Sequence, residues 1–270
     1  MKGETHMALT QVEEFADERI AVITLNNPSR RNALSQALLA ALENNLERLG
    51  QSRSVNVVII RSEGPVFSAG HDLHEILDQD LRRVRGLFQQ CAQTMTVIRR
   101  LPQVVVAEVS GIATAAGCQL VAACDLAIAA DTARFATPGV KIGYFCASPS
   151  VQVARNVPLK KAAEMLFTGD FISADEAKAY GLINRVVDSA SLSDAAWQFA
   201  REISRWSLPV IAAGKEFLYQ QIEMTEDGAA HFGVDFMTRQ SPDPDAVEGM
   251  SAFFEKRTPQ WSDRPKDKSS

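Results

Sequence analysis

Two turns rich in small residues are the parts of this sequence best suited to chemistry. One, residues 111–119, follows the apolar run 104–109 and opens onto a predicted helix. Small side chains leave backbone N–H groups uncovered at a helix N-terminus, where they can hold an oxygen that becomes negative during a reaction. The other turn, residues 67–73, follows the strand-like run 55–61. We expect it to supply a second N–H donor to the same oxygen, which would complete an oxyanion hole.

Stronger sequence signatures of other sites are absent. There is no G-x-G-x-x-G after a strand, no G-x-x-x-x-G-K-[ST] and no G-x-S-x-G, so neither a nucleotide cofactor nor a nucleophilic serine is predicted. His71 and His74 stand three residues apart, but no nearby spacing suggests a third ligand. We therefore predict a structural or surface role for this pair and no metal site.

Alternating strands and helices must position the two turns. Leu38, Leu42 and Leu46 recur at helical spacing, and Ser173 with Glu176 forms a capping box that starts another helix. The predicted strands are residues 11–15, 20–25, 55–61, 104–109, 126–130 and 134–136, and the predicted helices are 35–49, 81–100, 117–124, a stretch around 151, and 162–167. This order indicates an α/β fold built from strand, strand, helix units.

The chain divides by pattern into three parts. We expect an α/β core over residues 8–190 and a helical oligomerisation region over 191–261, where the pattern is helical almost throughout. A polar tail is predicted over residues 262–270. A chain of 270 residues has room for a core with such an appendage, whereas two unrelated full domains would be cramped.

Composition excludes several classes of partner. The net charge of −5 argues against a nucleic-acid partner held by a global positive field, and no uninterrupted apolar run reaches the ~18 residues of a membrane span. The four cysteines, without a C-x-x-C pair, are expected to be buried free thiols: Cys91, Cys118, Cys124 and Cys146. Residues 1–7 contain no apolar or Arg-rich targeting pattern, so a cytoplasmic location is expected.

A set of short segments gives the chain a family resemblance. In order, they are residues 27–28, 32–34, 67–73, 111–120, 124–125, 135, 138, 167–169, 174–182 and 248–253. Together they resemble the crotonase (enoyl-CoA hydratase/isomerase) superfamily over nearly the whole chain. The resemblance implies a crotonase-type spiral of ββα units with a C-terminal helical region, a homotrimer or hexamer, and an acyl-CoA thioester as substrate. Coenzyme A would then be part of the substrate, and no separate cofactor is implied.

The resemblance also implies roles for individual positions. The backbone N–H groups of His71 and Ala116 would hold the thioester oxygen, beside Gln119. Arg30 and Arg31 would lie near the nucleotide end of coenzyme A, although a solvated basic turn explains each arginine equally well. The other implied substrate-binding positions are Ala69 and Leu73 along the pantetheine path, Asp72, Gly117 and Gly139, and Phe253 and Lys256, which would reach a neighbouring subunit's coenzyme A.

The sequence departs from this family at the acid–base positions. The two glutamates with which its hydratases split water map onto Gln119 and Gly139, and neither residue exchanges a proton at neutral pH. Each lost group typically costs ~10²–10⁴ in rate, so ordinary hydration is not expected. The candidate substitutes are Glu108 before the second turn, Asp72 and Glu75 after the first, and Tyr144, Cys146 and Ser148 after Gly139. Tyr144 and Cys146 are nearest by spacing, and Glu108 is better explained by a salt bridge or subunit contact.

Two further carboxylates are interpreted as structural: Asp72 as a helix cap and Asp125 as an architectural residue that binds backbone. Two hypotheses for the whole chain follow. The first is an acyl-CoA enzyme whose reaction depends chiefly on the oxyanion hole, such as an isomerisation, a thioester cleavage or a decarboxylation. The second is a non-catalytic oligomer that binds acyl-CoA or acts as a scaffold.

Overall fold

The computed structural model describes residues 8–77 and 80–264. Its strands are β1 (Thr10–Phe15), β2 (Ile20–Leu25), β3 (Val57–Ser62), β4 (Val66–Ser68), β5 (Val104–Val109), β6 (Ile112–Thr114), β7 (Leu126–Ala130), β8 (Arg134–Ala136), β9 (Ile172–Ser173) and β10 (Arg185–Val187). Its α-helices are α1 (Gln36–Gly50), α2 (Leu73–Leu77), α3 (Leu81–Arg100), α4 (Ala116–Ala123), α5 (Ala147–Asn156), α6 (Leu159–Thr168), α7 (Ala174–Ala179), α8 (Leu192–Ser204), α9 (Leu208–Gln221), α10 (Glu226–Gln240) and α11 (Pro244–Glu255).

The described strands form two sheets. The larger has the order β1-β2-β3-β5-β7-β10, in which only the β1–β2 hairpin is antiparallel. The smaller has the order β4-β6-β8-β9. Successive strands of the chain alternate between the two sheets from β3 to β8, and a helix follows each pair. This is the predicted spiral of ββα units.

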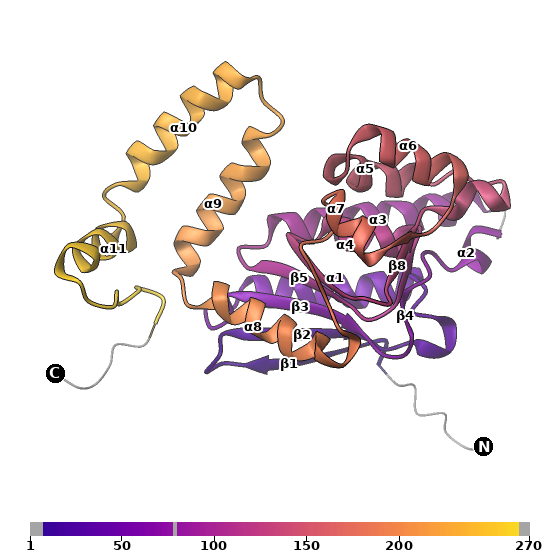
Figure 1. Ribbon diagram of the computed structural model, residues 1–270, viewed down its shortest axis with the longest axis horizontal. Helices are drawn as coiled ribbons and strands as arrows, with labels where there is room; N and C mark the ends of the chain where they lie inside the picture. The colour runs from indigo at the N-terminus through magenta and orange to yellow at the C-terminus, as the bar shows by residue number, and fades with distance from the viewer. Residues whose placement is uncertain (1–7, 78–79, 265–270) are drawn as a thin grey trace.

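Both faces of the larger sheet are buried. Helices α1, α3 and α4 cover one face over a core cluster that includes Leu38, Leu42 and Leu46, as their helical spacing predicts. Helix α8 lies across the other face (Figure 1) and packs Ala196 and Phe199 against β2, β3, β5 and β7. Strands covered on both faces are apolar along most of their length, and every residue of β2 is buried, with Thr24 its one polar residue.

The smaller sheet was largely missed by the sequence patterns. Only β8 was predicted. Strands β4 and β6 overlap the two segments interpreted as turns, and β9 ends at Ser173, which was interpreted as a helix cap. These strands are two or three residues long, too short to produce an alternating pattern. They matter for function, because the two small-residue turns follow β4 and β6.

The C-terminal helices leave the core after α8. Helices α9 and α10 form an antiparallel pair that projects away from the sheets, and α11 follows at the open end of the pair, opposite the turn that joins the two helices (Figure 1). Residues 262–264 of the predicted tail return to the core, where Asp263 pairs with Arg19 at 2.5 Å. Residues 1–7 and 265–270 lie outside the described residues. Among the described residues, no helix is both long and apolar enough to cross a membrane.

Candidate active site

The two predicted turns meet at one point of the structure. They follow β4 and β6, which are parallel neighbours in the smaller sheet. A Cβ atom on Gly70 would lie 2.8 Å from the Cβ of Ala115, and one on Gly117 would lie 2.3 Å from the carbonyl oxygen of Ser68. Glycine is therefore required at both positions for the turns to approach this closely. The first turn holds the N–H of His71 and the second that of Ala116.

The second turn has a backbone conformation that is rare for residues other than glycine. Ala115 has φ 49° and ψ −119°, a strained region that is typical of functional sites. Through this turn Ala116 becomes the first residue of α4. The N–H of a first helical residue takes no part in the helix's own hydrogen bonds, and the positive end of the helix dipole adds to its attraction for an anion.

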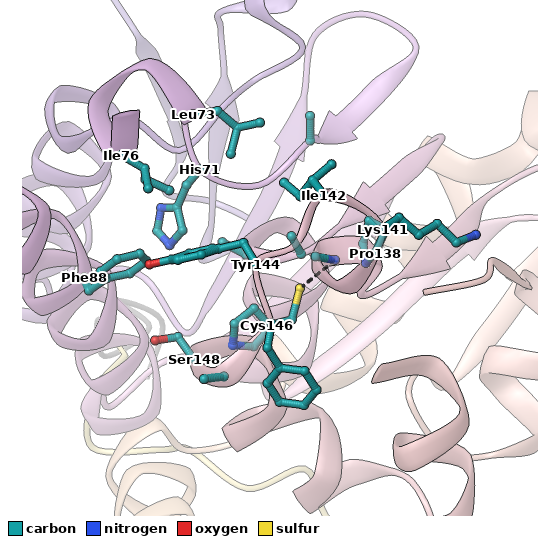
Figure 2. A pocket seen from close by; sticks show the side chains of 17 residues that line it. His71, Leu73, Ile76, Phe88, Pro138, Lys141, Ile142, Tyr144, Cys146 and Ser148 are labelled. Carbon is teal, nitrogen blue, oxygen red and sulfur yellow. Dashed lines mark hydrogen bonds between the residues drawn. The ribbon is translucent and has the colours of Figure 1, made fainter. Parts of the chain in front are cut away.

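A cavity of about 430 Å³ opens beside the two turns (Figure 2). It is walled mainly by apolar and aromatic side chains. These come from the turn after β4 with α2, from α3, from the turn before α4, and from the chain between the 3₁₀ turn Pro138–Ile142 and the start of α5. The predicted site residues on its wall are Ala69, His71, Leu73, Ala116 and Gly139. The structure thus brings both predicted N–H donors to one cavity of ligand size.

The His71 imidazole is part of this wall. Its Nδ1 lies 3.2 Å from the carbonyl oxygen of Leu34, and because a carbonyl only accepts, Nδ1 carries the proton. Burial lowers the pKa of His71, and the hydrogen bond to Leu34 opposes the shift in part. The ring is therefore neutral at pH 7, and Nε2 is an acceptor. Nε2 is buried and has no hydrogen-bond partner among the described residues.

Two aromatic rings face His71. Phe88 on α3 contacts it edge to face, with ring centroids 5.1 Å apart, and Tyr144 stacks on Phe88 at 6.3 Å. Figure 2 shows the His71 ring standing over this aromatic pair. Sequence reasoning assigned a role to the backbone of His71, considered its ring only in a metal pair, and missed Phe88. Ser148, one of the candidate groups after Gly139, does line the cavity. A histidine inside a turn of otherwise small residues was the available signal.

Gln119 is held away from the cavity. It is 3% exposed and does not line the cavity wall. Its Nε2 donates to Oε1 of Gln152 at 2.9 Å, and the Cys91 thiol lies 3.8 Å from its Oε1. Both ends of the amide are thus engaged between α3 and α5. Burial also raises the pKa of Cys91 to about 12, so this thiol stays protonated.

Gly139 lines the cavity but has no room for a side chain. A Cβ there would lie 2.0 Å from the carbonyl oxygen of Tyr144 and 2.8 Å from Sγ of Cys146. The N–H of Gly139 donates to that sulfur at 3.3 Å. Burial raises the pKa of Cys146, with a smaller opposite effect of this hydrogen bond, so Cys146 is unsuited to the role of a base at neutral pH.

Several predicted site residues lie off the cavity wall. Arg30 is mostly exposed and pairs with Asp72 at 3.3 Å, and Asp72 also accepts from the N–H of His74, as predicted for a cap. Arg31 has a left-handed backbone conformation, with φ 53°. Its backbone carbonyl accepts a hydrogen bond from the N–H of Ala69. Gly117 packs behind the wall, against Ser68. Phe253, which is 79% exposed, and Lys256 lie at the end of α11. Figure 1 shows α11 far from α2 and α5, which carry part of the cavity wall.

Two carboxylates considered from the sequence lie outside the cavity. Glu108 pairs in register with Ile128, which belongs to the cluster under α8, so its side chain faces the opposite side of the sheet. As a substitute acid it is excluded by position, although burial raises its pKa. Asp125 accepts the N–H of Val105 at 2.7 Å, which confirms its architectural role. Within the described residues, no cluster of three or more His, Cys, Asp or Glu side chains could hold a metal.

Comparisons with known proteins agree with this arrangement. The family model described as enoyl-CoA hydratase/isomerase matches residues 16–264. The chain is 45% identical over 244 residues to human enoyl-CoA hydratase domain-containing protein 3, covering 90% of this chain and 80% of that protein. It is 32% identical to 2,3-dehydroadipyl-CoA hydratase of Escherichia coli, and the match covers 92% of this chain and 96% of that protein. The crystal structure of the human protein has a TM-score of 0.91 at 43% identity, covering 94% of this chain and all of that one.

These matches confirm the family resemblance found in the sequence motifs, and they correct one prediction. The human relative is named as a mitochondrial protein, as are those of rat and mouse. The expectation of a cytoplasmic location was therefore wrong. It relied on the composition of residues 1–7, which take no part in the matched segment and carry no weight against homologues that match most of the chain.

Proposed function

This chain belongs to the enoyl-CoA hydratase/isomerase family, and on that premise we propose that it binds an acyl-CoA thioester in the cavity and polarises the thioester carbonyl with the N–H groups of His71 and Ala116. The observation that carries the proposal is the contact between the two turns, which Gly70 and Gly117 make possible at the cavity wall. Two N–H donors aimed at one oxygen stabilise the enolate that forms when a proton leaves the thioester's α-carbon.

The acid–base positions argue for a reaction other than two-carboxylate hydration. Gln119 is bound at both ends of its amide, and position 139 has no space for a glutamate. An oxyanion hole alone still lowers the barrier to any step that passes through a thioester enolate or a related oxyanion. We therefore propose an isomerisation, a thioester cleavage or a decarboxylation, with coenzyme A as part of the substrate and no further cofactor.

Coenzyme A itself would extend from the cavity toward Arg30 and Arg31, whose turn lies against the first loop. Arginines suit phosphate groups because their planar donors match phosphate oxygens. Phe253 and Lys256 are at the end of α11, and Figure 1 shows this helix far from α2 and α5, which line this chain's own cavity. They would contribute only to a neighbouring subunit's coenzyme A, which is why we propose a homotrimer or hexamer.

A panel of acyl-CoA thioesters incubated with the protein, with products followed by mass spectrometry, tests the function. Replacing Ala116 with lactic acid turns its N–H into an ester oxygen and leaves the side chain unchanged. We expect this change to lower turnover by ~10²–10³-fold, the usual cost of one oxyanion-hole donor. The same replacement at Ala174, the first residue of α7, is the matched control and should leave turnover unchanged.

The outcomes separate the alternatives. Equal turnover by the Ala116 ester and the unmodified protein would overturn the oxyanion hole. Tight thioester binding without turnover of any member of the panel would favour the non-catalytic hypothesis instead. If thioesters bind no better than the free acids in calorimetry, the acyl-CoA assignment itself fails.

A further inference from the structure

We propose that the imidazole of His71 is the acid–base group of this cavity, taking a proton from the α-carbon of the thioester through Nε2. This inference rests on the proposed function, because it needs a thioester oxygen on the N–H of the same residue. It adds a catalytic side chain at a position where only a backbone donor was expected. It also supplies the proton acceptor that Gln119 and Gly139 cannot provide.

The hydrogen bonding of the His71 ring leaves Nε2 as a free acceptor. Nδ1 is fixed as a donor to the Leu34 carbonyl, which sets the tautomer and aims Nε2 away from the chain segment that holds the ring. Nε2 is buried, unpartnered among the described residues and part of a cavity-lining side chain. A buried acceptor of this kind is unfavourable for stability alone. A function that needs a free lone pair explains its presence.

The groups that cover Nε2 leave it available to a ligand. Phe88 and Tyr144 face the ring in Figure 2. Tyr144 is 47% exposed. It follows Gly143, which has φ 73°, and a Cβ added to this glycine would meet no other atom within 4 Å. Tyr144, one of the two rings that cover Nε2, is thus a side chain on an exposed turn and does not belong to the packed core. An acyl chain that displaces this ring would lie directly against Nε2.

Burial, not neighbouring charge, keeps the His71 ring neutral. Lys141 from the 3₁₀ turn is held by Asp170 at 2.5 Å, and Glu75 from α2 accepts the N–H of Gln36 at 2.9 Å. Tyr144 is the other titratable group facing the ring, and α3 presents Phe88. Burial, and not a neighbouring cation, is the main cause of the lowered pKa of His71. The imidazole is therefore ready to accept a proton at neutral pH.

The step balances without another reactant. The Cα–H bond breaks and its proton moves to Nε2, while the electron pair forms the Cα–C double bond. The carbonyl π pair moves onto the thioester oxygen, which the two N–H donors hold. The products are an imidazolium and an enolate, and return of the proton to the α-carbon restores the thioester. If the imidazolium exchanges its proton with solvent first, the α-carbon acquires a solvent hydrogen.

Butyryl-CoA in D₂O provides the test, because it has α-protons and no double bond to hydrate. We expect the wild-type protein to place deuterium at the α-carbon, seen as a mass increase. The variant His71→Asn keeps the backbone N–H and an amide donor for Leu34 but has no acceptor at Nε2. It should lose at least ~10²-fold in exchange rate while its Kd for butyryl-CoA, measured by calorimetry, changes less than ~3-fold.

Controls separate a catalytic role from a structural one. His74→Asn changes the other histidine of the turn, which is exposed, and should exchange at the wild-type rate. The wild-type rate should rise with pH through the acid range and level off once His71 is neutral, and this step should be absent in His71→Asn. If His71→Asn unfolds, as judged by circular dichroism, His71→Gln takes its place.

Exchange by a folded His71 variant at the wild-type rate would overturn the proposal. So would a wild-type protein that binds butyryl-CoA but leaves its α-protons in place, and that result would leave thioester binding intact. Failure of butyryl-CoA to bind at all would instead count against the proposed function. The two proposals therefore fail by different measurements.

Discussion

Two buried titratable centres of this chain differ in how completely their polar atoms are paired. Lys215 on α9 donates to Asp125 at 2.6 Å and to the carbonyls of Ile98 and Gln103 at 2.9 Å. Tyr219 donates to the other carboxylate oxygen of Asp125 at 2.8 Å. All three donor sites of the ammonium are used, and both carboxylate oxygens accept.

His71 is the opposite case. Only Nδ1 is bonded, and Nε2 stays unpaired in the wall of a cavity. Burial lowers the pKa of both His71 and Lys215, so a shifted pKa does not distinguish them. Hydrogen-bond satisfaction does: a fully paired buried cluster stabilises one conformation, whereas an unpaired acceptor beside a cavity is available to a ligand. The first centre anchors α9 to the core, and the second belongs to the site.

The largest expected effect is on the anchor. Lys215→Met leaves the Asp125 carboxylate buried without its counter-charge, and we expect the free energy of unfolding to fall by about 3–5 kcal/mol. Urea unfolding at a fixed protein concentration measures it. Arg48→Met breaks a surface pair with Glu14 and should cost at most about 1 kcal/mol. Similar losses in the two variants would contradict the structural role of the anchor.

The second expected effect concerns the shape of the cavity. Gly139→Ala places a Cβ 2.0 Å from the carbonyl oxygen of Tyr144, so the turn must shift and we expect a loss of about 1–3 kcal/mol. Gly86→Ala, inside α3 with its nearest atom at 3.6 Å, should instead gain about 0.5–1 kcal/mol. Urea unfolding again provides the comparison. A stabilised Gly139→Ala variant would show that the turn can accept a side chain, and with it a restored glutamate.

Sequence patterns predicted β1, β2, β3, β5 and β7 of the larger sheet because these strands are long, whereas β10, which has three residues, was missed. Six-residue strands such as β2 and β5 are apolar at all but one position, and α1 and α3 repeat their leucines or other apolar residues at helical spacing. The capping box at Ser173 and Glu176 was likewise predicted and is present. The smaller sheet could not be found in this way, since its strands are too short to show a period.

The candidate site likewise has features that could be predicted from the sequence and features that could not. The two turns were predictable, because only small residues permit the contacts of Gly70 and Gly117. The free lone pair of His71 was not predictable, because it depends on Leu34, Phe88 and Tyr144, which come together only in the folded chain. The hydrogen bond from Gln119 to Gln152 could not be predicted for the same reason.

The smallest expected effect is the pH dependence that His71 gives to stability. Because its pKa is lowered in the folded state, the unfolded chain binds more protons once the pH falls below about 6.5. Stability from this group is therefore complete above pH 6.5 and is lost as the pH falls toward the lowered pKa. The loss amounts to about 1.4 kcal/mol for each unit of the shift.

His71→Asn cannot titrate, so its free energy of unfolding should fall less between pH 7 and pH 5. Other groups contribute alike to both proteins, and the difference between the two urea-derived curves isolates His71. Parallel curves would mean that the ring titrates alike in the folded and the unfolded chain, which would contradict the buried, unpaired Nε2 that separates this centre from the Asp125 anchor.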